Sequence, residues 1–128
     1  MQKDALRPTD AELDVLGILW SHGPCTVKQV HELLTGKPKR GYTTILKLMQ
    51  IMCDKRLVTR RKQGRAHVYQ ARVSAEKTRR SMLSHLIDKA FDGSAARLIM
   101  QALTTGSTTE MELEEIRRLL ERKEGEQS

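Results

Sequence analysis

The chain has 128 residues, a formal net charge of +7 and an aromatic content of only 3%. This length accommodates one small domain with a short appendage, but not two large independent cores. Because aromatic residues are so few, the core must be built from aliphatic side chains and Met, which favours helices. No run approaches the roughly 18 apolar residues that span a bilayer, so we expect a soluble protein.

The positive charge is concentrated in the first part of the chain. Residues 1–73 hold 14 Lys and Arg against 6 Asp and Glu, whereas residues 74–128 hold 9 against 10. No acidic residue occurs from Leu33 to Met52 or from Lys55 to Ala75, although these stretches contain eleven basic residues. Such clustering favours a polyanionic partner. The alternative is a solvated basic face that only keeps the chain soluble.

The reactive residue types give no sign of a catalytic or metal site. Cys25 and Cys53 have no paired spacing and no secretory leader precedes them, which predicts reduced thiols in a cytoplasmic protein. The four histidines show neither HxxxH nor HExxH spacing, so no metal and no cofactor is predicted. Motifs such as a phosphate loop or GxSxG are also absent, and we expect no enzymatic activity.

Two helices with capping boxes are predicted first. Thr9 and Glu12 can satisfy each other's free amides at the start of a helix that stops near Gly23. Thr26 and Gln29 repeat this pattern before a second helix of about nine residues. Both boxes precede an apolar stripe, so each helix is predicted to pack one face on a core.

A third helix and a β-hairpin follow. Apolar residues at helical spacing predict a helix that begins after the basic loop at 37–41 and runs to about Arg56. The helical period then gives way to short β-type segments at 57–61 and 66–70, which predict a hairpin with a basic tip at 62–65. Three helices and a hairpin form a winged helix, whose third helix enters the DNA major groove. Residues 1–73 are therefore predicted to be a winged-helix DNA-binding domain.

Residues 74–128 return to a helical period. Ser74 and Ser94 are placed to cap two helices, the first ends at Asp92-Gly93, and a third begins near Thr109. The predicted fold class is thus mainly α with a small β-hairpin: a winged helix-turn-helix domain followed by a C-terminal helical region.

The apolar stripes of this region exceed what a short tail can bury alone. They are predicted to pair with a second copy of the chain in an isologous dimer, so that 74–128 is a dimerisation region. The alternative is that they fold back on the N-terminal part of the same chain. The candidate dimerisation residues are Met82, Leu86, Phe91, Leu98, Ile99, Leu103, Leu113, Ile116 and Leu120.

The predicted third helix carries the candidates for reading DNA. Tyr42, Thr43 and Thr44 lie at its N-terminal end, where backbone amides and the helix dipole favour a phosphate. Thr43 and Thr44 could instead serve only to start the helix. One turn further on, Lys47 can donate to guanine, and Gln50 can pair with adenine.

Basic and polar residues around this helix are candidates for contacts with the DNA backbone, which position a protein without specifying a sequence. The wing and the helix entrance supply Arg40, Arg60, Arg61, Lys62 and Arg65. Thr26 and Lys28, at the start of the second helix, and His67, on the wing, are further candidates, although capping alone explains Thr26. Trp20 and Tyr69 are predicted to lie in the core.

The sequence resembles the bacterial penicillinase and methicillin-resistance repressors, the BlaI/MecI family. The resemblance spans most of the chain, and its motifs are Thr9-Asp10-Ala11-Glu12-Leu13 with Ile18-Leu19-Trp20, Gly41-Tyr42-Thr43-Thr44-Ile45-Leu46-Lys47-Leu48-Met49, Gly64-Arg65-Ala66-His67-Val68-Tyr69 and Phe91-Asp92-Gly93-Ser94. It implies homodimers that bind a pseudo-palindromic operator through winged helices and dimerise through C-terminal helices. It also implies repression that lasts until an inducing membrane sensor-protease cuts the repressor.

Three departures from the family pattern stand out. Arg56 occupies a position that is usually Gly, where a positive φ would be costly for Arg. Gln101 and Ala102 match the family's cleaved Asn–Phe bond and are thus the candidate cleavage position, with altered side chains. The last residues, 121–128, hold none of the cysteines of the copper-responsive members, so copper sensing is not predicted.

These observations predict a sequence-specific transcriptional repressor that acts as a homodimer on a double-stranded DNA operator, with regulated proteolysis as a route of release. A non-specific or architectural nucleic-acid-binding protein that uses the same basic face is the main alternative. In a further alternative the winged helix is only a protein-interaction module. A strong preference for one palindrome over random DNA separates the first reading from the other two.

Overall fold

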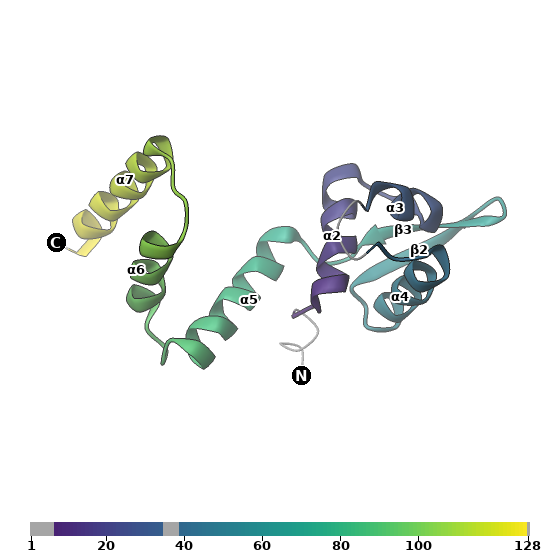
Figure 1. Ribbon diagram of the computed structural model, residues 1–128, viewed down its shortest axis with the longest axis horizontal. Helices are drawn as coiled ribbons and strands as arrows, with labels where there is room; N and C mark the ends of the chain where they lie inside the picture. The colour runs from purple at the N-terminus through teal and green to yellow at the C-terminus, as the bar shows by residue number, and fades with distance from the viewer. Residues whose placement is uncertain (1–6, 35–38, 128) are drawn as a thin grey trace. The chain divides into compact units, whose positions relative to one another are not determined.

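The computed structural model describes residues 7–34 and 39–127 (Figure 1). Residues 37 and 38 of the predicted basic loop, and the predicted end of the second helix near residue 36, lie outside the described residues. The chain divides into two compact units, Met1–His85 and Leu86–Ser128. The elements in chain order are α2 (Asp10–His22), β1 (Cys25–Thr26), α3 (Val27–Leu33), α4 (Tyr42–Asp54), β2 (Val58–Gln63), β3 (Ala66–Ala71), α5 (Ala75–Ala90), α6 (Ala95–Thr105) and α7 (Glu110–Gln127).

Both predicted capping boxes are confirmed. At the start of α2, the Thr9 hydroxyl accepts from the Glu12 amide at 3.2 Å and the Glu12 carboxylate accepts from the Thr9 amide at 2.9 Å. At the start of α3, Thr26 and Gln29 make the same exchange at 3.2 and 2.8 Å. These bonds satisfy amides that the first turn of a helix leaves without partners. Gly23, with a φ of 81°, then ends α2.

The sheet has three strands rather than the two of the predicted hairpin. Its order is β1-β3-β2, with both pairings antiparallel and Cys25 opposite Tyr69. A strand of only two residues is too short to show an alternation, which is why β1 could not be predicted from the sequence. The wing tip is also shorter than predicted, because β2 extends to Gln63 and the turn is made by Gly64 and Arg65.

The core of the N-terminal unit lies where the three helices meet the sheet. Leu16 of α2, Val30 of α3 and Ile45, Met49 and Met52 of α4 are all fully buried. Tyr69 of β3 is 1% exposed and therefore lies in the core, as predicted. Trp20 packs against this cluster from its edge, half-buried, and its Nε1 donates to the Val73 carbonyl oxygen at 3.0 Å.

Arg56 has a φ of 65°, the left-handed conformation that makes this position favourable for Gly. The geometry is that of a helix C-terminus: the Leu57 amide donates back to the Met52 carbonyl at 2.9 Å, which forces the chain to reverse direction after α4. In this conformation the Cβ of Arg56 is forced close to a carbonyl oxygen, and the family's usual Gly, which has no Cβ, avoids this strain.

Arg56→Gly is therefore expected to stabilise the protein, by about 0.5–1 kcal/mol after allowing for the greater backbone freedom of Gly in the unfolded chain. Urea unfolding of the two proteins measures the difference. Arg56→Ala is the matched control, because it removes the same charge but keeps the Cβ. Equal stability of the Gly and Ala variants would contradict the assignment of strain to this residue.

The C-terminal helices begin and end close to the predicted positions. Ser74 and Ser94 accept the amides of Lys77 and Arg97, each at 3.1 Å. Positive φ values at Asp92 and Gly93 turn the chain after α5. No residue of α6 or α7 is buried, so their apolar faces are only partly covered within the described chain. None of the described helices is both long and apolar enough to cross a membrane.

Candidate nucleic-acid interface

Helix α4 has one buried face and one open polar face. Its buried residues, Ile45, Met49 and Met52, anchor it to the core. At 3.6 residues per turn, Thr43, Lys47 and Gln50 fall on the opposite side. All three are exposed, and none makes a side-chain hydrogen bond or ion pair with the described part of the chain. This row of donors and acceptors is available to a partner.

The N-terminus of α4 is open as well. Its N-cap is Gly41, which has no side chain to accept from the first amides, so these donors face outwards with the positive end of the helix dipole. Thr43 and Thr44 lie inside the helix and make no capping bond, so helix initiation does not account for them. Tyr42 is 48% exposed and packs edge-on against His31 of α3, with ring centroids 6.1 Å apart.

A hollow of about 470 Å³ lies where the starts of α3 and α4 meet the wing. Five predicted DNA-contacting residues come together around it from distant parts of the sequence: Thr26, Lys28, Tyr42, Arg65 and His67. Within this group the Thr26 hydroxyl is already engaged, since it caps α3. The remaining side chains combine two basic groups, a phenol and an imidazole, a set suited to phosphate and sugar contacts.

The basic residues of the wing are divided between two faces. Residues opposite each other in an antiparallel pair lie on the same face, and successive residues alternate. Arg60 pairs with Tyr69 and Lys62 with His67, so these residues share the face that leads into the core, whereas Arg61 lies on the other face. Arg60 donates to the Tyr69 hydroxyl at 3.5 Å, and this contact raises the pKa of the guanidinium. All four basic residues of the wing, Arg60, Arg61, Lys62 and Arg65, are exposed.

Two ion pairs that the sequence did not predict hold this region in place. Arg40, a predicted phosphate contact, donates to the Asp14 carboxylate of α2 at 3.1 Å. In the absence of DNA its guanidinium is therefore part of an ion pair. Lys55, just after α4, donates to the Glu12 carboxylate at 2.8 Å. These partners are 26 and 43 residues apart in the chain, and no local pattern reveals such a pairing.

Glu12 is 2% exposed and ties the first turn of α2 to the end of α4. Burial by itself would raise the pKa of its carboxyl group, but the hydrogen bonds from Lys55 and Thr9, together with the Lys55 charge, outweigh this effect and leave the pKa below its ordinary value. A carboxylate with a depressed pKa stabilises the fold above its ordinary pKa, and this stabilisation is lost as the pH falls through the folded-state value.

Glu12→Gln is accordingly expected to cost about 1–2 kcal/mol near neutral pH, since Lys55 is half exposed and the pair is only partly desolvated. The difference from the parent protein should shrink between neutral pH and an acidic pH below the folded-state pKa of Glu12, because both proteins then carry a neutral side chain there. Urea unfolding at the two pH values measures it. Glu32→Gln, at an exposed residue of α3, is the control. A difference that does not change with pH would contradict the stabilising role of the Glu12 charge.

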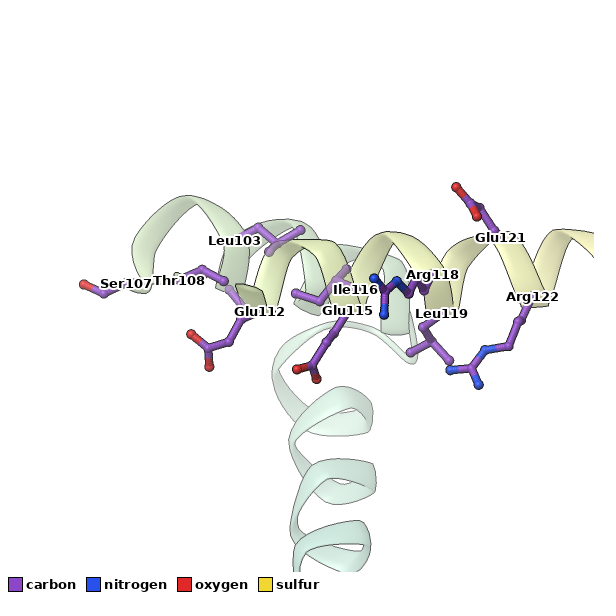
Figure 2. A pocket seen from close by; sticks show the side chains of 11 residues that line it. Leu103, Ser107, Thr108, Glu112, Glu115, Ile116, Arg118, Leu119, Glu121 and Arg122 are labelled. Carbon is purple, nitrogen blue, oxygen red and sulfur yellow. The ribbon is translucent and has the colours of Figure 1, made fainter. Parts of the chain in front are cut away.

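The C-terminal unit has its own hollow, of about 1040 Å³, between α6 and α7 (Figure 2). Leu103 of α6 and Ile116 and Leu119 of α7 supply its apolar part, and charged residues of α7, including Glu115 and Arg122, surround them. The predicted dimerisation residues are all accessible: Leu86, Ile99, Leu103, Leu113 and Leu120 are exposed, and Met82, Phe91, Leu98 and Ile116 are half-buried. Four further apolar residues that the predicted dimerisation set leaves out are exposed as well: Leu83, Met100, Met111 and Leu119.

The candidate cleavage position lies within α6. Gln101 and Ala102 are both exposed, and the hydroxyls of Thr104 and Thr105 donate to the Gln101 carbonyl oxygen at 3.0 and 2.8 Å. Among the described residues, no three His, Cys, Asp or Glu side chains are grouped so that they could hold a metal ion.

Three helices closed by a small antiparallel sheet, with a basic wing beside an open third helix, define a winged helix-turn-helix protein. Comparison with known proteins places the chain more closely. The family model of the penicillinase repressor matches residues 8–122, and the chain belongs to this family. It is 41% identical over 61 residues to the transcriptional regulator BlaI of Mycobacterium tuberculosis, in strains CDC 1551 / Oshkosh and ATCC 25618 / H37Rv. That similarity covers 47% of this chain and 44% of the relative.

Proposed function

We propose that the protein is a transcriptional repressor that binds a pseudo-palindromic DNA operator as a homodimer in the bacterial cytoplasm. The observation that carries the proposal is the open polar row of α4, formed by Thr43, Lys47 and Gln50, beside the basic wing. Membership of the penicillinase repressor family supports it. The name of the mycobacterial relative, a transcriptional regulator, agrees with it.

Each part of the interface has a distinct role in this proposal. Lys47 donates to the O6 and N7 acceptors of guanine, and Gln50 pairs with the N6 and N7 edge of adenine. The open amides at the start of α4 hold a phosphate at the edge of the major groove. Arg61 and Arg65 follow the backbone beside the wing and supply affinity without base preference.

The dimer is proposed from the second unit. Eleven residues of α6 and eighteen of α7 include no buried side chain, although both helices carry several large apolar residues. A second copy of the chain would cover these faces and place two winged helices on the two halves of a palindrome. In this proposal residues 1–73 contact DNA and residues 74–128 join the two protomers.

Release by proteolysis is the remaining part of the proposal. Cutting the bond between Gln101 and Ala102 would separate α7 and part of α6 from the DNA-contacting unit. A sensor-protease of the membrane would act as the inducer. The test is incubation of the purified repressor with membranes from induced cells, followed by mass spectrometry for a fragment that ends at Gln101. Recovery of intact protein alone would remove this step from the proposal.

The function itself is tested by selecting preferred duplexes from a random DNA pool at physiological salt. We expect a two-fold symmetric motif with half-sites about one helical turn apart, preferred over random DNA by roughly 10³ or more. Recovery of bound DNA without any motif would favour the architectural alternative. Failure to retain DNA at all would favour a protein-interaction module and overturn the proposal.

A further inference from the structure

Ile51 stands apart from the other apolar residues of α4. Every other aliphatic or sulfur-containing side chain of this helix belongs to the core cluster or packs against it: Ile45, Leu46, Leu48, Met49, Met52 and Cys53. Ile51 does neither and is 40% exposed. Among the described residues between 7 and 73, the only other large exposed hydrophobic residue is Tyr42, at the start of the same helix. An isolated exposed Ile is unremarkable on most surfaces, so its position on α4 decides its meaning.

That position is on the open side of the helix. Residues three and seven apart share a helical face, so Thr44, Lys47 and Ile51 form one row along α4. The row extends over about 10 Å, the length of three base-pair steps. Lys47 belongs both to this row and to the polar row that carries the proposed function. A helix placed to bring Lys47 to a base edge therefore brings Ile51 to the floor or wall of the same groove.

In the major groove, an isoleucine side chain has one base-specific partner. Thymine is the only base that presents a methyl group in the major groove, beside the hydrogen-bond donors and acceptors of the base edges. An aliphatic side chain forms no hydrogen bond, so the thymine methyl group is the base feature that suits it best. We propose that Ile51 is a specificity-determining residue that contacts a thymine methyl group in each half-site of the operator; this inference rests on the proposed function.

The test uses the full chain and the operator obtained by selection. Each thymine of one half-site is replaced in turn by uracil, which lacks only the methyl group. For the parent protein, one replacement is expected to weaken binding about fourfold per half-site, the effect of removing one methyl group from contact. For Ile51→Ala, the same replacement is expected to have no effect, because the contact is already absent.

Two further variants give this comparison its controls. Ile51→Val keeps branched methyl groups and should retain sensitivity to uracil, whereas Lys47→Ala should bind more weakly overall but remain as sensitive as the parent protein. Far-ultraviolet circular dichroism confirms that each variant is folded, which is expected because Ile51 lies outside the core cluster. If the Val variant keeps its sensitivity to uracil and the Ala variant loses it, the effect comes from the side chain at position 51.

The outcomes separate this inference from the proposed function. Suppose that the parent protein selects an operator, but no thymine-to-uracil replacement affects it differently from the residue 51 variants. In that case the inference is wrong and the proposed function stands. If Ile51→Ala weakens binding equally to thymine and uracil operators, residue 51 contacts protein or DNA backbone, which also overturns it. Failure of the parent protein to select any operator would reject both at the first step.

Discussion

Two carboxylates on the apolar face of α6 are expected to weaken operator binding by about 10²–10⁴-fold without unfolding the DNA-contacting unit. The change is Ile99→Asp with Leu103→Asp, at residues that are 45% and 40% exposed in the chain by itself. Buried in a dimer, each carboxylate would lose its hydration without a partner, so the protomers should separate. A monomer holds only one half-site and forgoes the gain in affinity that comes from linking two binding units.

The measurement combines sedimentation, to report the oligomeric state, with operator titration. Gln101→Asp with Thr104→Asp is the matched control, because it adds the same two charges to the other side of α6, where both residues are exposed. This control should remain dimeric and bind as the parent protein does. A doubly charged Ile99/Leu103 variant that still sediments as a dimer would show that protomers associate through another surface.

Operator affinity is expected to fall by about 10³-fold or more between roughly 50 and 200 mM salt, because each phosphate contact releases condensed counterions. In the proposed interface, these contacts come from the exposed cations around α4 and the wing. Replacing Arg61 and Arg65 with Ala should reduce the slope of log affinity against log salt by about one for each contact removed. The selected sequence should stay the same, since backbone contacts carry no base preference.

Fluorescence anisotropy titrations across a salt series provide this slope. Arg117→Ala with Arg118→Ala is the control, because it removes two positive charges from α7, where both side chains pair with Glu114. Its slope should equal that of the parent protein. The wing would not contact the DNA backbone if the affinity of the parent protein did not change with salt. The same would follow if the slope of log affinity against log salt were equal for the parent protein and the wing variant.

Local sequence signals were sufficient for most element boundaries. The boxes of Thr9 with Glu12 and of Thr26 with Gln29 contain within four residues all the groups that cap a helix, so they act in the same way wherever the chain places them. The positive φ at position 56 was expected only because of the resemblance to a family with Gly there. The hairpin of β2 and β3 was predicted because two short β-type segments flank the turn at Gly64 and Arg65.

Predictions failed or were incomplete where a feature depends on residues distant in the chain. Strand β1 exists only because Cys25 and Thr26 lie beside Tyr69 and Val68 of β3. Thr26 and Lys28 were candidate contacts from local composition, but their grouping with Arg65 and His67 around one hollow is a property of the folded chain. Arg40 was predicted as a phosphate contact, but its ion pair with Asp14, 26 residues away in the chain, could not be predicted from local sequence.

The sequence by itself determined the order of the helices and of the two hairpin strands, the basic character of the N-terminal part and the polar row on α4, because these follow from periodicity, caps and charge within short windows. The tertiary structure alone decided which apolar residues are left uncovered. Ile51 and Met52 are adjacent in sequence and similar in chemistry, yet one is 40% exposed and the other fully buried. The packing of α4 against α2, α3 and β2 makes that difference, and it requires contacts between segments far apart in the chain.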